Sequence, residues 1–264
     1  MMTAAIHEQY TKEIYDGLGY FAVWMPNSPV ALGDVGFVRG RRFHRMTSLA
    51  DLGIAFETVG PGAAVVHSYA SESGVEVSVN GDVATPDVLG IAPQLTVTVT
   101  FHRAHTTYLR AVDCTEEAIR DHLALQRGLT ELRETGVWLG EYVVVTKLVR
   151  TGPAVIMVSS QAATRVEFQA SAGDLAPLSL PVGSAGAGVG TSVGSSLAAE
   201  AVALDGGLTP FLELSALRRG LSARPRLRLR GPGTGSKPDG TSADRWELAP
   251  LSWEQFAEDG VPAS

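Results

Sequence analysis

Cysteine is nearly missing from this chain of 264 residues, because Cys114 is its only one. A single thiol excludes an intramolecular disulfide and a cysteine-rich metal site. Long apolar runs are missing as well, since none approaches the roughly 18–20 residues of a membrane-spanning helix. The opening residues lack the basic and apolar regions of a secretory signal. We therefore expect the chain to be cytoplasmic in its resting state.

Positive charge is scarce too: the net charge is −7, which argues against a general nucleic-acid-binding protein. One segment departs from that balance, because residues 218–230 hold six arginines and no acid. These are Arg218, Arg219, Arg224, Arg226, Arg228 and Arg230. Such a cluster is typical either of an edge strand whose charges block aggregation or of a surface that contacts anionic lipid headgroups.

Glycine-rich segments are present, but neither has the spacing of a nucleotide-binding loop. In residues 231–238 (GPGTGSKP) a serine separates the last glycine from the lysine, and Pro238 blocks the helix that a phosphate-binding loop requires. Residues 186–190 (GAGVG) lack the third glycine of the dinucleotide fingerprint. We predict no nucleotide cofactor.

Catalytic and metal-binding patterns are equally sparse. No Gly-x-Ser-x-Gly elbow marks a serine hydrolase. His102 and His105 are the best candidate metal ligands, but three residues apart in an expected strand they would point to opposite faces, with no carboxylate nearby. We predict no catalytic, metal or cofactor-binding residue, and we expect the protein not to be an enzyme.

The pattern that does occur throughout the chain is that of β-strands. Apolar residues recur at every second position in two segments: Val75, Val77 and Val79, then Leu95, Val97, Val99 and Phe101. This alternation predicts strands with one apolar face. Further strands are expected at 20–25, 105–112, 141–149, 154–159, 164–170, 197–204 and 210–217, and a short hairpin at 35–46.

Two helices are expected. Ile6, Tyr10 and Ile14 lie four residues apart near the N-terminus, and a second helix is predicted near 115–134 with Thr115 as its N-cap and Leu123 in its apolar stripe. Apolar residues make up 45% of the chain, enough for a sizeable core. The predicted fold class is α+β: a central twisted, mostly antiparallel sheet with long hairpins.

The C-terminal part divides into a linker and a tail. Residues 231–245 contain almost nothing apolar and predict a flexible linker after a main domain of residues 1–230. Apolar residues return in residues 246–264, namely Trp246, Leu248, Leu251, Trp253 and Phe256. A tail with this many large apolar side chains is expected to pack back on the main domain.

The order of these parts is similar to that of gasdermins. Residues 141–150 (EYVVVTKLVR) resemble the tyrosine-valine-valine-threonine-glutamate strand of that family, which likewise follows a leucine-bearing helix and precedes a long hairpin. The hairpin around residues 33–38 and the strands over 62–112 fall in a compatible order. Pro181-Val182-Gly183-Ser184 resembles the proline-x-glycine-serine of animal members.

This resemblance implies a mechanism. A latent monomer would be activated when a protease removes the C-terminal tail, and the freed domain would form a homo-oligomeric β-barrel pore in the inner membrane and kill the cell, as in bacterial antiphage defence. The six arginines would contact anionic lipid, the two alternating segments would form the membrane-hairpin face, and the five apolar tail residues would be the autoinhibitory contacts.

A second hypothesis stays open: a non-catalytic recognition or adaptor domain of a bacterial defence system. The alternating strands would then form an ordinary packed sheet, and the tail would be structural. The two hypotheses differ in what deletion of residues 231–264 does. A pore former becomes toxic and binds membranes, whereas an adaptor merely loses stability.

Overall fold

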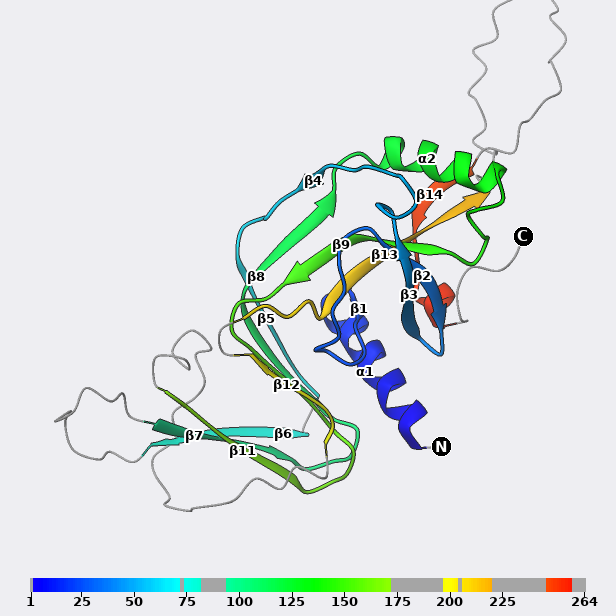
Figure 1. Cartoon of the computed structure of the whole chain (residues 1–264). Helices are drawn as coiled ribbons and strands as arrows, with labels where there is room; N and C mark the ends of the chain where they lie inside the picture. Colours follow the sequence, from blue (N-terminus) through cyan, green and yellow to red (C-terminus); the bar gives the residue numbers. More distant parts are fainter. Residues whose placement is uncertain are drawn as a thin grey trace, which may run out of the picture.

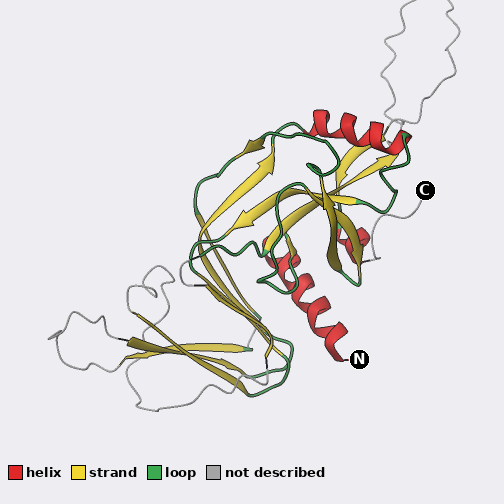
Figure 2. Cartoon of the chain, in the orientation of Figure 1, coloured by secondary structure: helices red, strands yellow, loops and turns green. Residues whose placement is uncertain are grey.

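The structure is a computed structural model, and it describes residues 2–71, 74–81, 94–171, 197–203, 206–219 and 246–257. It confirms the α+β class, with an N-terminal helix against a large antiparallel sheet (Figures 1 and 2). The elements are α1 (Met2–Leu18), β1 (Phe21–Ala22), β2 (Asp34–Arg39), β3 (Arg42–Ser48), β4 (Thr58–Val59), β5 (Val65–Ala70), β6 (Val75–Gly81), β7 (Gln94–Phe101), β8 (Thr107–Ile119), α2 (His122–Glu134), β9 (Val143–Arg150), β10 (Ala154–Ser159), β11 (Thr164–Ser171), β12 (Leu197–Ala203), β13 (Phe211–Arg219), β14 (Trp246–Pro250) and α4 (Trp253–Ala257).

The strands form two sheets. The main sheet has the order β1–β13–β9–β8–β10–β12, to which β14 adds beside β13, β2 and β3 beside β9, and β4 and β5 beside β8. The small sheet has three strands in the order β11–β7–β6. Every pairing described is antiparallel.

Strand β8 connects the two halves of the main sheet. Its first residues pair with β10 on one side and β5 on the other. Its last residues pair with β9 and with β4. At the change of partners Asp113 has a φ of +50°, and Gly152 approaches so closely that an added Cβ would lie 2.9 Å from the Asp113 Cβ. A residue with a larger side chain than glycine would therefore push the strands apart at this bend.

The two faces of β8, β10 and β12 are covered by different elements (Figure 1). Helix α1 covers one face with Ile6, Tyr10 and Ile14, which pack with Leu109 and Ile156 as their spacing predicts. The small sheet covers the other face. In this half of the molecule the core is thus a three-layer stack of helix, main sheet and small sheet, and two further apolar clusters lie around β9 and β13.

The hairpin of β2 and β3 has the geometry that its turn residues require. Gly40 and Arg41 have φ of +57° and +55°, the positive values of a type I′ turn. Gly36 lies directly beneath the partner strand, since an added Cβ would lie 1.9 Å from the His44 carbonyl oxygen.

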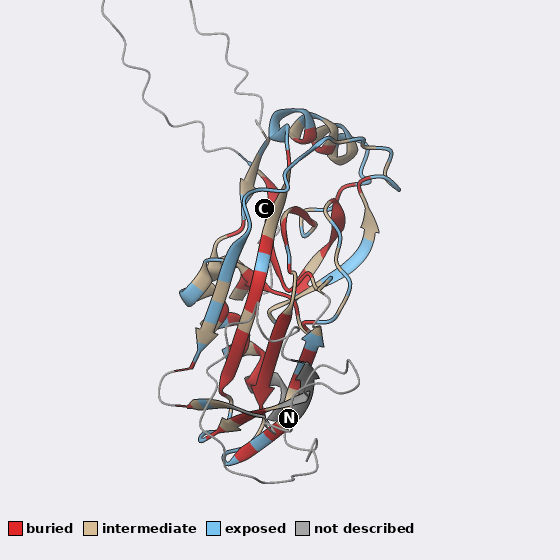
Figure 3. Ribbon diagram, turned by 90° about the vertical axis from the view of Figure 1, so that its left-hand side faces the viewer, coloured by how far each residue is buried: buried red, intermediate tan, exposed pale blue. Residues whose placement is uncertain are grey.

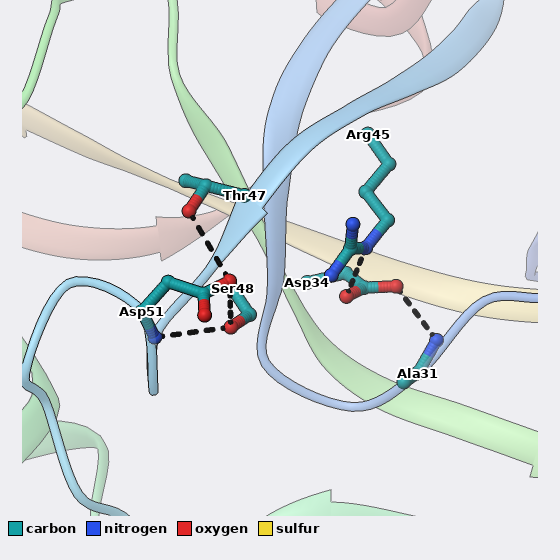
Figure 4. Close-up of polar contacts among 6 residues, drawn as sticks. All are labelled: Ala31, Asp34, Arg45, Thr47, Ser48 and Asp51. Atoms are coloured by element: carbon teal, nitrogen blue, oxygen red, sulfur yellow. Dashed lines mark hydrogen bonds and ion pairs between the residues drawn. The ribbon is translucent and has the colours of Figure 1, made fainter.

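Polar contacts fix the base of this hairpin (Figure 4). The buried Asp34 carboxylate accepts hydrogen bonds from the Ala31 backbone N–H at 2.8 Å and from the Arg45 Nε at 2.7 Å. Ser48 donates to the Asp51 carboxylate at 2.8 Å, which closes the turn that follows β3.

The predicted start of the second helix is wrong. Thr115, expected as its N-cap, lies in β8, which runs to Ile119, and the helix α2 begins at His122 with Asp121 as its N-cap. Glu116 and Glu117 do not form a first helical turn, because they face Lys147 and Arg150 across the pairing with β9. One member of the predicted apolar stripe is wrong: Leu123 is 71% exposed, and Leu125 is buried beside Leu129 instead.

The strand expected at 20–25 is shorter than predicted, because only Phe21 and Ala22 pair with β13. The strand expected at 105–112 runs further, to Ile119, and the other predicted strands lie within a few residues of their expected positions. Within the described residues, no helix combines the length and apolar character needed to cross a membrane.

Candidate functional site

The tail is an integral part of the main sheet. Strand β14 pairs antiparallel with the end of β13, from Ser215 opposite Pro250 to Arg219 opposite Trp246. Helix α4 then turns under the sheet, where Phe256 is 1% exposed and its ring stacks on Phe21 with centroids 4.4 Å apart. The prediction that the tail packs on the main domain agrees with this arrangement.

All five predicted tail residues contact the main domain. Leu251, Trp253 and Phe256 belong to the apolar cluster beneath β1, β9 and β13, and Trp253 lies 5.2 Å from Tyr15 of α1 between ring centroids. Trp246 and Leu248 pack instead against the cluster beneath α2. The tail therefore contacts two separate apolar clusters and helix α1, and its removal would uncover parts of each.

The two predicted lipid-contacting arginines that the structure describes, Arg218 and Arg219, both contact the tail. Arg218 donates a hydrogen bond to Oε1 of Gln255, and its Nε is buried without a hydrogen-bond partner. Burial lowers the pKa of Arg218. The Arg219 guanidinium lies 5.7 Å from the centre of the Trp246 ring. Arg224, Arg226, Arg228 and Arg230 lie outside the described residues, as do residues 231–245.

Three further residues in this contact were not predicted. Arg133 of α2 lies 4.0 Å from the centre of the Trp246 ring, so two guanidinium groups contact one indole. Gln126 accepts a hydrogen bond from the Leu248 backbone N–H at 3.0 Å. Gln255 accepts from the Ser252 backbone N–H at 2.9 Å, and a Ser-x-x-Gln pattern is a capping box that the sequence displays.

The predicted membrane-hairpin residues lie between the two sheets. Val97, Val99 and Phe101 of β7 are fully buried and pack with Tyr108, Val155 and Met157 of the main sheet. Figure 3 shows the buried residues along the main-sheet strands. Val75 and Val77 of β6 are partly buried in the same cluster. The backbones of Val79 and Leu95 continue these strands, opposite Val97 and Gly81, and their side chains are outside the description.

Each strand of the small sheet is joined directly to a strand of the main sheet. The connections are residues 71–74 from β5 to β6, 102–106 from β7 to β8, and 160–163 from β10 to β11. Figure 1 shows the chain turning back at a common corner between β7 and β8 and between β10 and β11, and β5 and β6 meet the same corner. We call these three segments the hinge connections.

Buried hydroxyl groups bind the hinge connections to one another. The Ser71 Oγ accepts a hydrogen bond from the Thr107 N–H at 2.8 Å, which ties the first connection to the start of β8, where the second connection ends. The Ser159 Oγ accepts from the Thr106 N–H at 3.1 Å and donates to the Arg103 carbonyl at 3.1 Å, which ties the second connection to the end of β10, where the third connection begins. The corner between the sheets is therefore closed by specific hydrogen bonds as well as by apolar packing.

The two histidines considered as metal ligands lie in the second hinge connection, so the expected strand there is wrong. His105 has a φ of +59°, outside the extended region of regular strands, and His102 lies just after the end of β7. A carboxylate does lie nearby, since the Glu76 Oε2 is 3.4 Å from the His102 Nε2. In the part of the chain that the structure describes, no group of three potential metal ligands gathers.

A polar cluster lies on the main sheet beside α1. The Tyr20 hydroxyl donates to Glu116, and Lys147 lies between Glu116 and Glu213 at 4.0 and 3.5 Å. Burial, then the Glu116 contact, raises the pKa of Tyr20 well above its usual range. The cluster holds two carboxylates and one ammonium group, and the Tyr20 hydroxyl bonds to one of the two carboxylates.

No protein-family model matches the chain, and no characterised protein is significantly similar to it in sequence.

Proposed function

We propose that this protein is a latent, non-catalytic pore former that is activated when a protease removes its C-terminal tail. The observation that carries the proposal is the corner between the sheets. Straightening the three hinge connections would join strands into continuous segments of residues 65–81, 94–119 and 154–171. Each exceeds the roughly 9–11 residues that a tilted strand needs to cross a bilayer.

The distribution of apolar residues supports the proposal. The apolar face of the small sheet, with Val97, Val99 and Phe101, is closed against the main sheet. Opening the corner in water would expose this face at a cost of about 25 cal/mol for each Å². Contact with lipid would offset that cost, so the open form is favoured at a membrane and the closed form in solution.

The tail contact supports a role in latency. Removing β14 and α4 would uncover the edge of β13 and the guanidinium groups of Arg218 and Arg219. These arginines would then contact anionic lipid headgroups. In this scheme the latent protein is cytoplasmic, and cleavage within residues 231–245 sends it to the inner membrane. There it assembles with further copies into a β-barrel pore. The pore causes cell death in antiviral defence.

Dye release from anionic liposomes tests the proposal. Protein nicked within residues 231–245 is expected to cause leakage, and intact protein is not. Nicked protein that has shed its tail, keeps its circular dichroism and causes no leakage would contradict pore formation and favour the adaptor hypothesis.

Thiol labelling tests the opening of the corner separately. In a Cys114→Ser background, Val99→Cys is expected to resist labelling in the intact protein, because Val99 is fully buried, and to become labelled after nicking in the presence of liposomes. Leu123→Cys is the matched control, because Leu123 is 71% exposed and its thiol should react in every state. Protection of Val99→Cys that persists in leaking samples would contradict the opening.

A further inference from the structure

Helix α1 contacts the hinge connections through one pair of side chains. The Ser71 hydroxyl donates a hydrogen bond to the Glu13 Oε2 at 2.9 Å, while the same oxygen accepts from the Thr107 N–H. Ser71 is 8% exposed and stands where β5 leaves the main sheet, and Thr107 stands where β8 enters it. One hydroxyl therefore joins the helix to the first hinge connection and to the start of β8, where the second connection ends.

The face of α1 that packs on the main sheet is less apolar than the spacing of Ile6, Tyr10 and Ile14 predicts. His7 and Thr11 are buried in it, and the fully buried Tyr10 hydroxyl has no hydrogen-bond partner. A buried hydroxyl without a partner disfavours the docked position, because the same group would bind water if the helix moved away. The helix is held by apolar packing that this hydroxyl partly offsets, and by polar contacts near its start, where the His7 Nε2 lies 2.6 Å from the Gly40 carbonyl oxygen and Arg41 donates to Glu8 at 2.7 Å. The Glu13–Ser71 contact adds to these at the other end of the helix.

Helix α1 also lies very close to the strand that leads into the hinge. A Cβ added at Gly17 would lie 2.9 Å from the Tyr69 ring of β5. Glu13 is one helical turn earlier, and its second oxygen accepts from the exposed Gln9 at 3.0 Å. The Glu13 carboxylate is therefore oriented from its own helix while it holds Ser71.

We propose that the Glu13–Ser71 contact is a latch through which the docked α1 keeps the small sheet closed against the main sheet, so that displacement of α1 releases the hinge connections. This inference rests on the proposed opening of the corner and adds a second control to it, at a contact between Glu13 and Ser71 in which no tail residue takes part. Tail removal alone would then leave the corner closed until α1 is also displaced.

Hydrogen exchange on the full chain, with the tail attached and no membrane, tests the latch. Glu13→Ala is expected to speed exchange of the amides of β6, β7 and β11 about tenfold, the factor that corresponds to losing about 1.4 kcal/mol. Gln9→Ala is the matched control: it removes the other bond to Glu13, leaves Ser71 untouched and should leave the small sheet unchanged. Glu13→Gln keeps an acceptor oxygen for Ser71 and should have a smaller effect, and it replaces Glu13→Ala if that variant fails to fold.

A double variant separates a latch from a merely structural contact. Ser71→Ala removes the same contact, so adding Glu13→Ala to it should speed the small sheet no further. Faster exchange confined to α1 in Glu13→Ala, an equal effect of Gln9→Ala, or additive effects in the double variant would each overturn the latch.

The latch and the pore can fail separately. Exchange in the intact chain decides the latch without any membrane, whereas leakage by the nicked parent protein decides pore formation. If both hold, nicked Glu13→Ala should release dye faster than nicked parent protein, and an equal rate would overturn the role of the latch in opening.

Discussion

Gln255 offers a way to add charge to the tail contact without changing its size. Its Oε1 accepts from both Ser252 and Arg218, and Arg218 forms no ion pair with a carboxylate in the described part of the chain. Gln255→Glu would place a carboxylate at this oxygen and would also add negative charge to the first turn of α4, where a helix favours it. Charge-assisted bonds are about twice as strong as neutral ones, but the site is only half buried, so the expected gain is about 1 kcal/mol.

Tail dissociation after nicking measures this gain. In a chain with a specific protease site placed within residues 231–245, Gln255→Glu is expected to slow release of the tail about fivefold, the factor that corresponds to about 1 kcal/mol. Gln255→Leu should speed release, because it leaves the half-buried Arg218 guanidinium without its acceptor.

Arg218→Met supplies the decisive control for this prediction. In that background the rates of tail release with and without Gln255→Glu should differ by clearly less than fivefold, because the cation is gone and only the favourable charge at the first turn of α4 remains. Two results would refute the reasoning. One is equal tail release with and without Gln255→Glu when Arg218 is present, and the other is a fivefold difference that persists after Arg218→Met.

Three further predictions concern the main domain. Phe101→Ala should lower the free energy of unfolding by about 3–5 kcal/mol in chemical denaturation, because the ring is fully buried between the sheets; a loss below 1 kcal/mol would contradict that packing. Burial raises the pKa of Tyr108 to about 12, so the tyrosine ionises first in the unfolded state, whose pKa is about 10. The free energy of unfolding should therefore be unaffected below about pH 10 and fall as pH rises toward 12, and Tyr108→Phe should reduce this alkaline loss. Burial lowers the pKa of His67, so stability should fall as pH drops below the unfolded pKa of about 6.5, and His67→Gln should flatten thermal melting temperatures across that range.

Local patterns predicted most of the strands, because alternation is a property of neighbouring residues. Val97, Val99 and Phe101 lie on one buried face as their spacing indicates. The same local reading failed at Thr115, since a threonine followed by two acids resembles a helix start while the partner residues that hold it in β8, Lys147 and Arg150, lie more than 30 positions away.

The candidate site was predictable only in part. The apolar residues of the tail predicted that it packs on the main domain, because large side chains such as Phe256 are usually buried. Its polar contacts could not be derived, since Arg133 meets Trp246 and Gln126 meets Leu248 only after the sheet is assembled. Arg218 and Arg219 were selected for their charge, and nothing local indicated that the tail would contact both.

Strand β8 limits how this protein can change over evolution. It pairs with β4, β5, β9 and β10, so its register is fixed by four neighbours. Loss or gain of one residue within it would turn every following side chain to the opposite face in both halves of the main sheet. Lineages of this protein should therefore differ along residues 107–119 by substitution alone, while changes in length accumulate in the segments that join the strands.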